Sequence, residues 1–257
     1  MNNGIRILFL GASALVLGAQ TSDAHYGMII PSDTMVEQQD DRTISLTVGF
    51  AHPFEQDGME LAQPNVFRLY SPSAEVDLLS ELTAADVMGA SGYTLSLPIK
   101  EPGLHVLYME PKPYWEPAED AFIIHHTKTY VAAFGQEDGW DKPHGLVTEI
   151  RPLSKPYGLW AGNLFQGQVL RDGQPVPNAE VEVEYFNQGG SIVAPSKYMI
   201  TQTIIADDDG IFSYATPASG WWGFAALTTA DYTLPQEGVE KTVELGAVIW
   251  VHFEDWK

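Results

Sequence analysis

The stretch GQVLRDGQPVPNAEVEVE, residues 167–184, decides the fold class of this chain. Its first part is an apolar run that ends at Asp172-Gly173, a dipeptide typical of tight turns between strands. Its last part alternates valine with glutamate, which is the period of a strand with one buried face. The pattern continues with strand-like runs at residues 201–206, 211–216, 220–228 and 245–253, and Asp207 to Gly210 forms a predicted turn. This half of the chain is therefore predicted to be all-β.

The layout from Gly173 to Phe212, a GxPVxxAxVxV run followed by DxxGxF, resembles small β-sandwich modules of the transthyretin-like or collagen-adhesin B type. The first half shows similar short runs at residues 43–50, 65–70, 93–99, 103–110 and 122–134, and only residues 75–88 have the pattern of a short helix. We therefore expect two β-sandwich domains of the Ig-like or transthyretin-like kind. They would span residues 25–155 and 156–257, joined by the proline- and glycine-rich segment 152–162.

The first 24 residues have the three parts of a cleavable secretion signal: Arg6, an apolar run from Ile7 to Ala19, and small residues at Ser22-Asp23-Ala24. The apolar run is shorter than the roughly 20 residues that a membrane span needs, so an uncleaved anchor is the weaker interpretation. Cleavage after Ala19 would place Leu17 where a small residue is wanted. Cleavage is predicted between Ala24 and His25, which makes the mature protein periplasmic in a Gram-negative bacterium, with no direct membrane anchor.

Composition limits the function classes. The net charge of −21 disfavours nucleic acid and anionic lipid as partners and attracts cations. The chain has no cysteine, which excludes disulfides, thiolate metal sites and cysteine nucleophiles. A metal site must use nitrogen and oxygen ligands, which suit Ni(II), Co(II), Cu(II) or Zn(II).

Two of the seven histidines differ from the others by position. Cleavage after Ala24 would give His25 a free α-amine with a reference pKa near 8, so that one residue offers two nitrogen ligands. His52 lies where a predicted strand ends at Pro53, at a rim open to a site. His125 and His126 are adjacent in a strand and point to opposite faces, so at most one of them joins a given site. The remaining histidines, His105, His144 and His252, have the ordinary pattern of structural residues.

The loop PKPYWEPAED, residues 111–120, places Glu116 and Glu119 among prolines and aromatic residues. It offers an oxygen ligand, an acceptor for an imidazole N–H, or simply a rigid acidic edge. The Asp207–Gly210 run lacks the glutamate of an EF-hand. No nucleophile elbow, phosphate-binding loop or His-Glu-x-x-His motif is present, so the sequence does not predict an enzyme.

Five segments together resemble the periplasmic nickel/cobalt-binding accessory component of energy-coupling-factor nickel/cobalt uptake transporters. They are His25–Asp33 (HYGMIIPSD), His52–Glu55 (HPFE) with Gly58-Met59, Tyr114–Asp120 (YWEPAED), Ile124–Lys128 (IHHTK) and Tyr157–Asn163 (YGLWAGN). The resemblance extends over nearly all of the mature chain.

The resemblance implies a protein that captures Ni(II), or Co(II), and hands it to the membrane subunits of such a transporter. The matching histidines are His25, His52 and His125, the last favoured over its neighbour His126. In this hypothesis the amine and imidazole of His25 form a chelate, the other two imidazoles complete a nitrogen-rich set, and water, Glu116 or Glu119 fills a remaining position. Affinity should then fall below about pH 6.

Two alternatives remain open from the sequence. An N-terminal histidine amine with two imidazoles on a β-sandwich is also how copper polysaccharide monooxygenases hold their metal, which would make this chain a copper histidine-brace oxidoreductase. The other alternative is a structural or adhesive protein in which the two sandwiches act as spacers.

Overall fold

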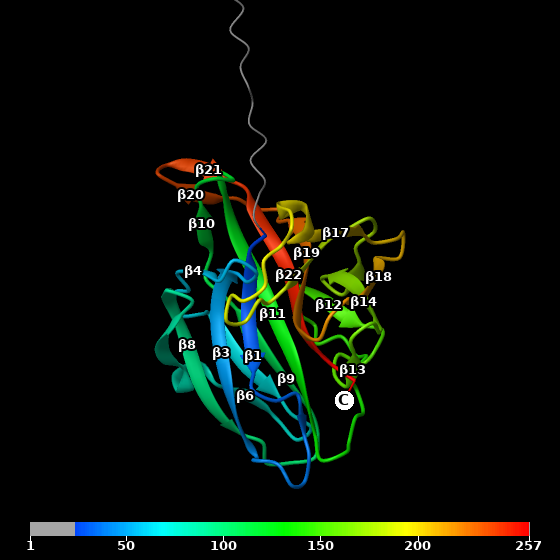
Figure 1. Ribbon diagram of the computed structural model, residues 1–257. Coiled ribbons are helices and arrows are strands. Elements are labelled where there is room, and N and C mark those ends of the chain that lie inside the picture. The colour runs from blue at the N-terminus through cyan, green and yellow to red at the C-terminus, as the bar shows by residue number, and fades with distance from the viewer. Residues whose placement is uncertain (1–23, 257) are drawn as a thin grey trace, which may run out of the picture.

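The computed structural model describes residues 24–256, and these form an all-β fold (Figure 1). The predicted signal peptide lies outside the described residues except for Ala24. Within residues 24–256 there is no helix long and apolar enough to cross a membrane. The only helical elements of this range are two single 3₁₀ turns, η1 (Leu79–Glu81) and η2 (Lys197–Met199). The all-β prediction is confirmed.

The N-terminal sheet holds the first strand of the described residues at its edge. Its order is β1 (Tyr26–Pro31), β3 (Thr43–His52), β8 (Ala90–Pro98) and β7 (Thr83–Val87), with β4 (Asp57–Met59) paired to the end of β3. Along β3 the alternation of Ile44, Leu46 and Val48 with polar residues buries one face, as the period of two requires.

The central sheet is the largest, with 11 strands in the described part of the chain. Its main path runs β17 (Gln202–Ile205), β16 (Glu180–Tyr185), β19 (Gly220–Thr229), β22 (Val243–Glu254), β11 (Ala121–Ala133), β9 (Gly103–Glu110), β5 (Val66–Tyr70) and β6 (Glu75–Asp77). Three short strands pair at its sides: β10 (Tyr114–Glu116) and β2 (Met35–Val36) on β11, and β13 (Leu159–Trp160) on β22.

The C-terminal sheet consists of β12 (Thr148–Pro152), β14 (Leu164–Arg171) and β15 (Gln174–Pro175), with β18 (Ile211–Ala215) paired to β14. A separate hairpin of β20 (Leu234–Gln236) and β21 (Val239–Lys241) extends beyond the sheets (Figure 1). The predicted turn at Asp172-Gly173 is confirmed, because both residues have the positive φ that a type I′ turn requires.

The two predicted β-sandwiches are present, and they share the central sheet. One core lies between the N-terminal sheet and the β5–β9–β11 part of the central sheet, with Phe67 and Val131 at its centre. The other lies between the C-terminal sheet and the β16–β19–β22 part, around Phe165 and Phe224. The two halves join where β22 pairs in parallel with β11, so that the red last strand lies beside the green β11 in Figure 1. The predicted boundary after residue 155 falls in the loop that follows β12.

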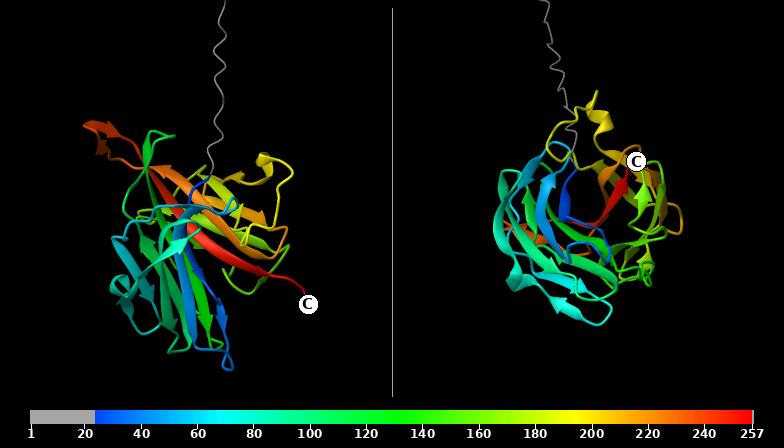
Figure 2. Two further views of the ribbon diagram at one scale, coloured as in Figure 1. Left: turned by 60° about the vertical axis from the view of Figure 1, so that its left-hand side comes forward. Right: turned by 60° about the horizontal axis from the view of Figure 1, so that its bottom comes forward.

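Strand β1 lies inside the molecule although it is an edge strand of its sheet. All six of its residues are buried, and Figure 2 shows the blue strand enclosed between the sheets. A Cβ on Gly27 would lie 2.1 Å from Thr127 Oγ1 and 3.3 Å from the Cβ of His125, so glycine is what allows β1 to cross so close to β11. The Trp250 indole N–H donates to the Gly27 carbonyl at 2.7 Å, which fixes β1 against β22.

The predicted short helix at residues 75–88 is wrong. This segment forms β6, the η1 turn and β7. Strand β7 is drawn into a hairpin with β8, because Met88 and Gly89 both have positive φ and close a two-residue turn between Val87 and Ala90. Tertiary pairing therefore overrides the weak helical pattern.

Candidate functional site

His25 and His52 are brought together by the register of β1 and β3. Tyr26 pairs with Ala51 in the antiparallel ladder, so the preceding residue, His25, comes opposite the following one, His52. Residues that face each other in this way have side chains in contact. The centroids of the two imidazole rings lie 4.6 Å apart, so His25 and His52 meet where β1 begins and β3 ends.

Two carboxylates of the β10–β11 hairpin flank the ring of His25. Glu116 Oε2 lies 3.2 Å from His25 Nε2, and Glu119 Oε1 lies 3.8 Å from His25 Nδ1. Because an ionised carboxylate can only accept a hydrogen bond, Glu116 holds the proton on Nε2. The Nδ1 lone pair is then directed toward Glu119 and is free to bind a metal, in the carboxylate–histidine–metal arrangement of many metal sites.

His25 is a neutral imidazole at physiological pH. It is 7% exposed, and burial, together with the nearby imidazoles of His52 and His125, lowers its pKa to about 4, although Glu116 acts in the opposite direction. Neutral imidazole is the form that binds metals. The site therefore does not have to remove a proton from this ring before a cation binds.

The second histidine contacts the peptide at the predicted cleavage point. His52 Nδ1 donates a hydrogen bond to the Ala24 carbonyl oxygen at 2.9 Å. That carbonyl belongs to the peptide bond that cleavage would break, and its carbon is bonded to the His25 nitrogen. Removal of residue 24 would leave His52 without this acceptor, next to the new amine of His25.

His125 lies one aromatic ring away from this pair. The ring of Phe50 stacks on His25 with centroids 5.9 Å apart and meets His125 edge-on at 5.7 Å. On β22, Gly246 is the register partner of His125, and a Cβ there would lie 2.3 Å from His125 Cδ2. The imidazole thus fills space that only a glycine leaves open.

The hydrogen bonding of His125 leaves its ring nitrogen Nδ1 without a partner. Its Nε2 lies 3.3 Å from Glu244 Oε1, so this carboxylate accepts the Nε2 proton. Its Nδ1 is buried and has no hydrogen-bond partner. An unsatisfied buried polar atom costs stability, and such an atom in a native fold points to a missing partner.

The three predicted ligands share a neighbourhood but do not form a closed site. Among residues 24–256, no three histidine or carboxylate side chains lie close enough together to hold a metal ion as they stand. His25 and His52 are in contact, whereas Phe50 separates His25 from His125. The α-amine of His25 adds a donor only after cleavage, because in the uncleaved chain this nitrogen belongs to a peptide bond.

Further carboxyl groups lie close to one another in this region. Burial raises the pKa of Glu182 to about 7, and Glu244, Glu180 and Glu119 raise it as well. Carboxylates that repel one another in this way are relieved by a nearby cation. The surroundings of the three histidines therefore favour a positively charged ligand.

The other four histidines have structural contacts elsewhere. His126 points to the opposite face of β11 from His125, where its Nδ1 meets the Tyr108 hydroxyl at 2.8 Å. The alternation was predicted correctly, but both faces are covered and both imidazoles are buried. The others bind local acceptors or pack against tyrosines: His105 with Gly103, His144 with Tyr70 and Tyr130, and His252 with Glu254.

Sequence reasoning missed Glu244, Gly246 and Phe50. Glu244 is 119 residues from His125 in the chain, and the two meet only because β22 inserts in parallel beside β11. Phe50 precedes His52 by two residues, so the alternation of a strand places both side chains on the same face. That spacing is the one signal that would have found it.

The fold defines this chain as an all-β protein, and it brings the three predicted ligands His25, His52 and His125 near one another. A model of the family described as "Domain of unknown function (DUF4198)" matches residues 22–230. The match spans most of the chain and both sandwiches, and the chain belongs to this family. The search of curated proteins found no match.

Solved structures that resemble the chain are of low similarity. The D0-D1 domain of Intimin is 14% identical, with 90% of this chain and 100% of that chain covered and a TM-score of 0.23. A putative carbohydrate binding protein from Bacteroides uniformis is 8% identical, with 86% and 97% covered and a TM-score of 0.24. These values support no inference about function.

Proposed function

We propose that the protein is a periplasmic Ni(II)- or Co(II)-binding protein that captures the metal through His25 and delivers it to a membrane nickel/cobalt transporter. The observation that supports this most strongly is the setting of the His25 ring. Glu116 fixes its Nε2 proton, Glu119 lies beside its Nδ1, and the ring of His52 lies against it. A buried neutral imidazole among carboxylates is suited to a divalent cation.

The proposed ligand set begins with the mature N-terminus. The α-amine and Nδ1 of His25 close a six-membered chelate ring with the metal, a geometry that Nε2 cannot reach. The 3.8 Å between Nδ1 and Glu119 Oε1 is within the range that two ligand atoms span when each lies about 2.0–2.2 Å from one metal. His52 supplies the next nitrogen.

His125 is the third proposed histidine. Its unpartnered Nδ1 and its Glu244-bound Nε2 resemble the arrangement at His25, with a carboxylate holding the outer proton in both cases. For His125 to bind the same ion, the Phe50 ring that separates the two histidines must move. Binding at His125 is therefore expected to involve a rotation of this aromatic side chain.

The transport role rests on the sequence resemblance and on the charge. A chain of net charge −21 attracts cations over its whole surface, and the site is at the rim where β1 begins. The membrane partner is proposed to be the set of membrane subunits of an energy-coupling-factor nickel/cobalt transporter.

Calorimetric titration tests the metal proposal. The protein is exported through its own signal, His25 is verified as the first residue by intact mass, and Ni(II), Co(II), Cu(II) and Zn(II) are titrated separately. His52→Gln should weaken Ni(II) binding at least about tenfold. The matched control is His252→Gln, which removes a half-buried imidazole that contacts Glu254 and Trp221 and none of the proposed ligands. Equal loss in both variants would contradict the proposed site.

The copper-oxidoreductase alternative predicts a different outcome. Raw affinity of a nitrogen-rich site follows the Irving–Williams order and favours Cu(II) over Ni(II), so tighter copper binding alone does not decide between them. Oxidation of polysaccharide by the copper-loaded protein with ascorbate would favour the alternative. The side chains of Phe50, His52 and Glu116 around the His25 ring favour the binding protein, because an oxygenase acting on a polymer needs an open copper face.

A further inference from the structure

The segment between β16 and β17, residues 186–201, exposes several apolar side chains to solvent, and we call it the apolar loop. Its exposed large apolar residues are Ile192, Val193, Tyr198 and Met199. Val193 and Tyr198 are the most open of them, at 86% and 89% exposed. Figure 2 shows this yellow segment standing out from the sheets. Single exposed apolar residues are ordinary, but several on one segment indicate an interaction site.

The apolar loop also lies in a stretch of sequence without acidic residues. Between Glu184 and Asp207 the only charged residue is Lys197, whereas the whole chain has 34 acidic residues and a net charge of −21. Carboxylates would be repelled by the phosphates of lipid headgroups. A lysine, in contrast, can hold its ammonium group at the level of the phosphates while its alkyl stem lies along apolar surface.

Hydrogen bonds hold the apolar loop in a defined shape. The Asn187 side chain accepts the Ile192 N–H at 3.0 Å and donates to the Ile192 carbonyl at 2.9 Å. The Ser196 hydroxyl accepts the Tyr198 N–H, and the Ser196 carbonyl accepts the Met199 N–H. The loop therefore presents its apolar side chains to solvent from a fixed backbone.

The same loop is bonded to the segment that follows His52. The carboxyl group of Glu184 accepts hydrogen bonds from the Phe54 N–H at 3.0 Å and from the Thr201 hydroxyl at 2.5 Å. Asn187 Nδ2 also donates to the Phe54 carbonyl at 3.1 Å. Both backbone polar groups of Phe54 are thus held from the apolar loop and its base. A surface that binds the loop lies close to the chain segment that carries His52.

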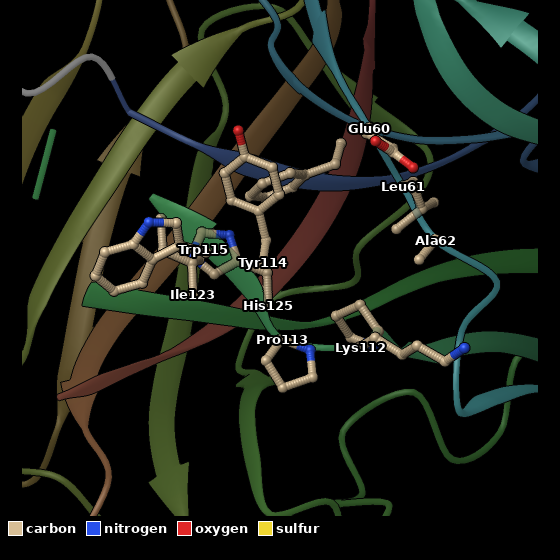
Figure 3. Close-up of a pocket in the computed structure, with 11 residues that line it drawn as sticks. Glu60, Leu61, Ala62, Lys112, Pro113, Tyr114, Trp115, Ile123 and His125 are labelled. Carbon is tan, nitrogen blue, oxygen red and sulfur yellow. The ribbon is translucent and has the colours of Figure 1, made fainter. Parts of the chain in front are cut away.

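The apolar loop protrudes, unlike the hollow beside His125. Figure 3 shows Leu61, Tyr114 and Ile123 around a space of about 190 Å³, a shape that receives a small molecule. Side chains that stand out from a loop have no such enclosure and fit a surface that deforms around them. The headgroup region of a bilayer is such a surface, and tyrosine is enriched there because its ring is apolar and its hydroxyl polar.

We infer that the apolar loop docks the protein on the zwitterionic headgroups of a membrane, with Val193 and Tyr198 entering the headgroup layer first. The inference rests on the proposed function for the need to reach a membrane, and it adds the surface that makes the contact. Binding of this kind is peripheral and reversible, because only a few apolar side chains enter the bilayer. The acidic remainder of the chain offers lipid phosphates no competing attraction, so the protein binds with the segment after His52 toward the membrane.

Vesicle binding by the mature, metal-free protein tests the inference. The protein is sedimented with vesicles of phosphatidylcholine alone, and of phosphatidylcholine and phosphatidylglycerol in equal parts. The test variant carries Val193→Ser and Tyr198→Ser, which remove two exposed apolar side chains without a change of charge. The matched control carries Val239→Ser and Tyr232→Ser, the same exchanges at exposed positions in the β20–β21 hairpin and just before it.

The parent and the control should bind phosphatidylcholine vesicles, and the test variant should partition onto them at least about tenfold less, because it gives up apolar burial. Phosphatidylglycerol should weaken the binding, since the chain carries a net charge of −21.

A fluorophore locates the contact. The chain has no cysteine, so Val193→Cys can carry a single polarity-sensitive dye. Its emission should shift to shorter wavelength on phosphatidylcholine vesicles, whereas the same dye on Val239→Cys should show no shift. Equal shifts at the two positions would contradict docking through the apolar loop.

The other outcomes are distinguishable. Absence of parent binding to phosphatidylcholine, equal partition of test variant and control, or binding only where phosphatidylglycerol is present would overturn the inference. Self-association in light scattering without vesicles, abolished in the test variant, would assign the loop to a second copy of this chain instead. Ni(II) titration of the same proteins is the separate readout of the proposed function. Lipid binding by a protein that binds no Ni(II) would overturn that function alone, and the absence of both would overturn both proposals.

Discussion

Glu116→Gln is the substitution that most directly tests how the site prepares His25. In the parent protein Glu116 Oε1 accepts the Ala118 N–H at 2.8 Å and Oε2 accepts the His25 Nε2–H at 3.2 Å. A glutamine keeps its oxygen on Ala118, because only the oxygen can accept that hydrogen bond. Its NH₂ group then faces His25 Nε2 and favours the tautomer with the proton on Nδ1, the nitrogen that is proposed to bind the metal.

The magnitude follows from this tautomer change. Metal binding must restore the Nε2–H form and give up the new hydrogen bond, which places two donors face to face at a buried position. Loss of such a supporting carboxylate reduces metal affinity by roughly 10- to 100-fold, which is about 1.4 to 2.7 kcal/mol. Calorimetric Ni(II) titration measures this loss, and ¹⁵N NMR of the imidazole reports the tautomer.

The control is Glu137→Gln, which removes the same charge from an exposed ion pair with Lys155. It corrects for the change in net charge and should leave Ni(II) affinity nearly unchanged. An unchanged Ni(II) affinity in Glu116→Gln would refute the reasoning about Nδ1. A shift to the Nδ1–H tautomer without loss of affinity would show that the metal does not use the His25 ring.

Three further results are expected. Gly246→Ala should displace the His125 imidazole, since the new Cβ would lie 2.3 Å from its Cδ2. This overpacking should lower the free energy of unfolding in urea by about 1–3 kcal/mol and weaken Ni(II) binding. A variant with parent-like stability and affinity would show that the site does not depend on the position of His125. Ni(II) affinity should fall by at least about one decade per pH unit as the amine of His25 becomes protonated below its reference pKa near 8. The His25 ring itself adds to this slope only near pH 4, because burial lowers the pKa of that ring to about 4. Affinity that is constant between pH 8 and 5 would exclude the amine. Lys128→Met should lower the free energy of unfolding by about 3–5 kcal/mol, because it leaves Glu149 buried and unpaired, and a urea midpoint equal to that of the parent would contradict this role of the ion pair.

The folded state is also expected to lose stability in acid, and the sign follows from the same pKa. A histidine whose folded pKa is lowered binds its proton less well in the folded state than in the unfolded state. Between pH 6.5 and about 4 the unfolded chain therefore takes up more protons at His25, and the stability falls as the pH decreases. Burial lowers the pKa of His126 and of His144 to about 4 as well, which adds to the trend.

Local sequence patterns were sufficient to predict most strands of the fold. The alternation in β16 and the turn at Asp172-Gly173 depend on residues within a few positions of one another, and both were predictable. The sharing of the central sheet by both sandwiches could not be predicted, since the parallel pairing of β22 with β11 brings together residues about 120 positions apart. No periodicity within one segment reports such a pairing.

The residues of the candidate site were likewise predictable only where local sequence patterns identify them. His25 and His52 were predictable because chain position and a strand end single them out, and Glu116 was named as a possible acceptor from its loop. Glu244 could not be found, because its contact with His125 exists only through the long-range pairing. Phe50 likewise lies between His25 and His125 only because two sheets pack against one another.

The central claim is that the free N-terminal nitrogen of His25 binds the metal. The direct measurement compares Ni(II) titration of the mature protein, whose first residue is verified by mass, with that of the same protein carrying one extra alanine ahead of His25. The account predicts that the extra residue weakens binding on the order of 100-fold or more, since the second donor of a chelate acts at high effective concentration. Equal affinity for the two proteins would contradict it.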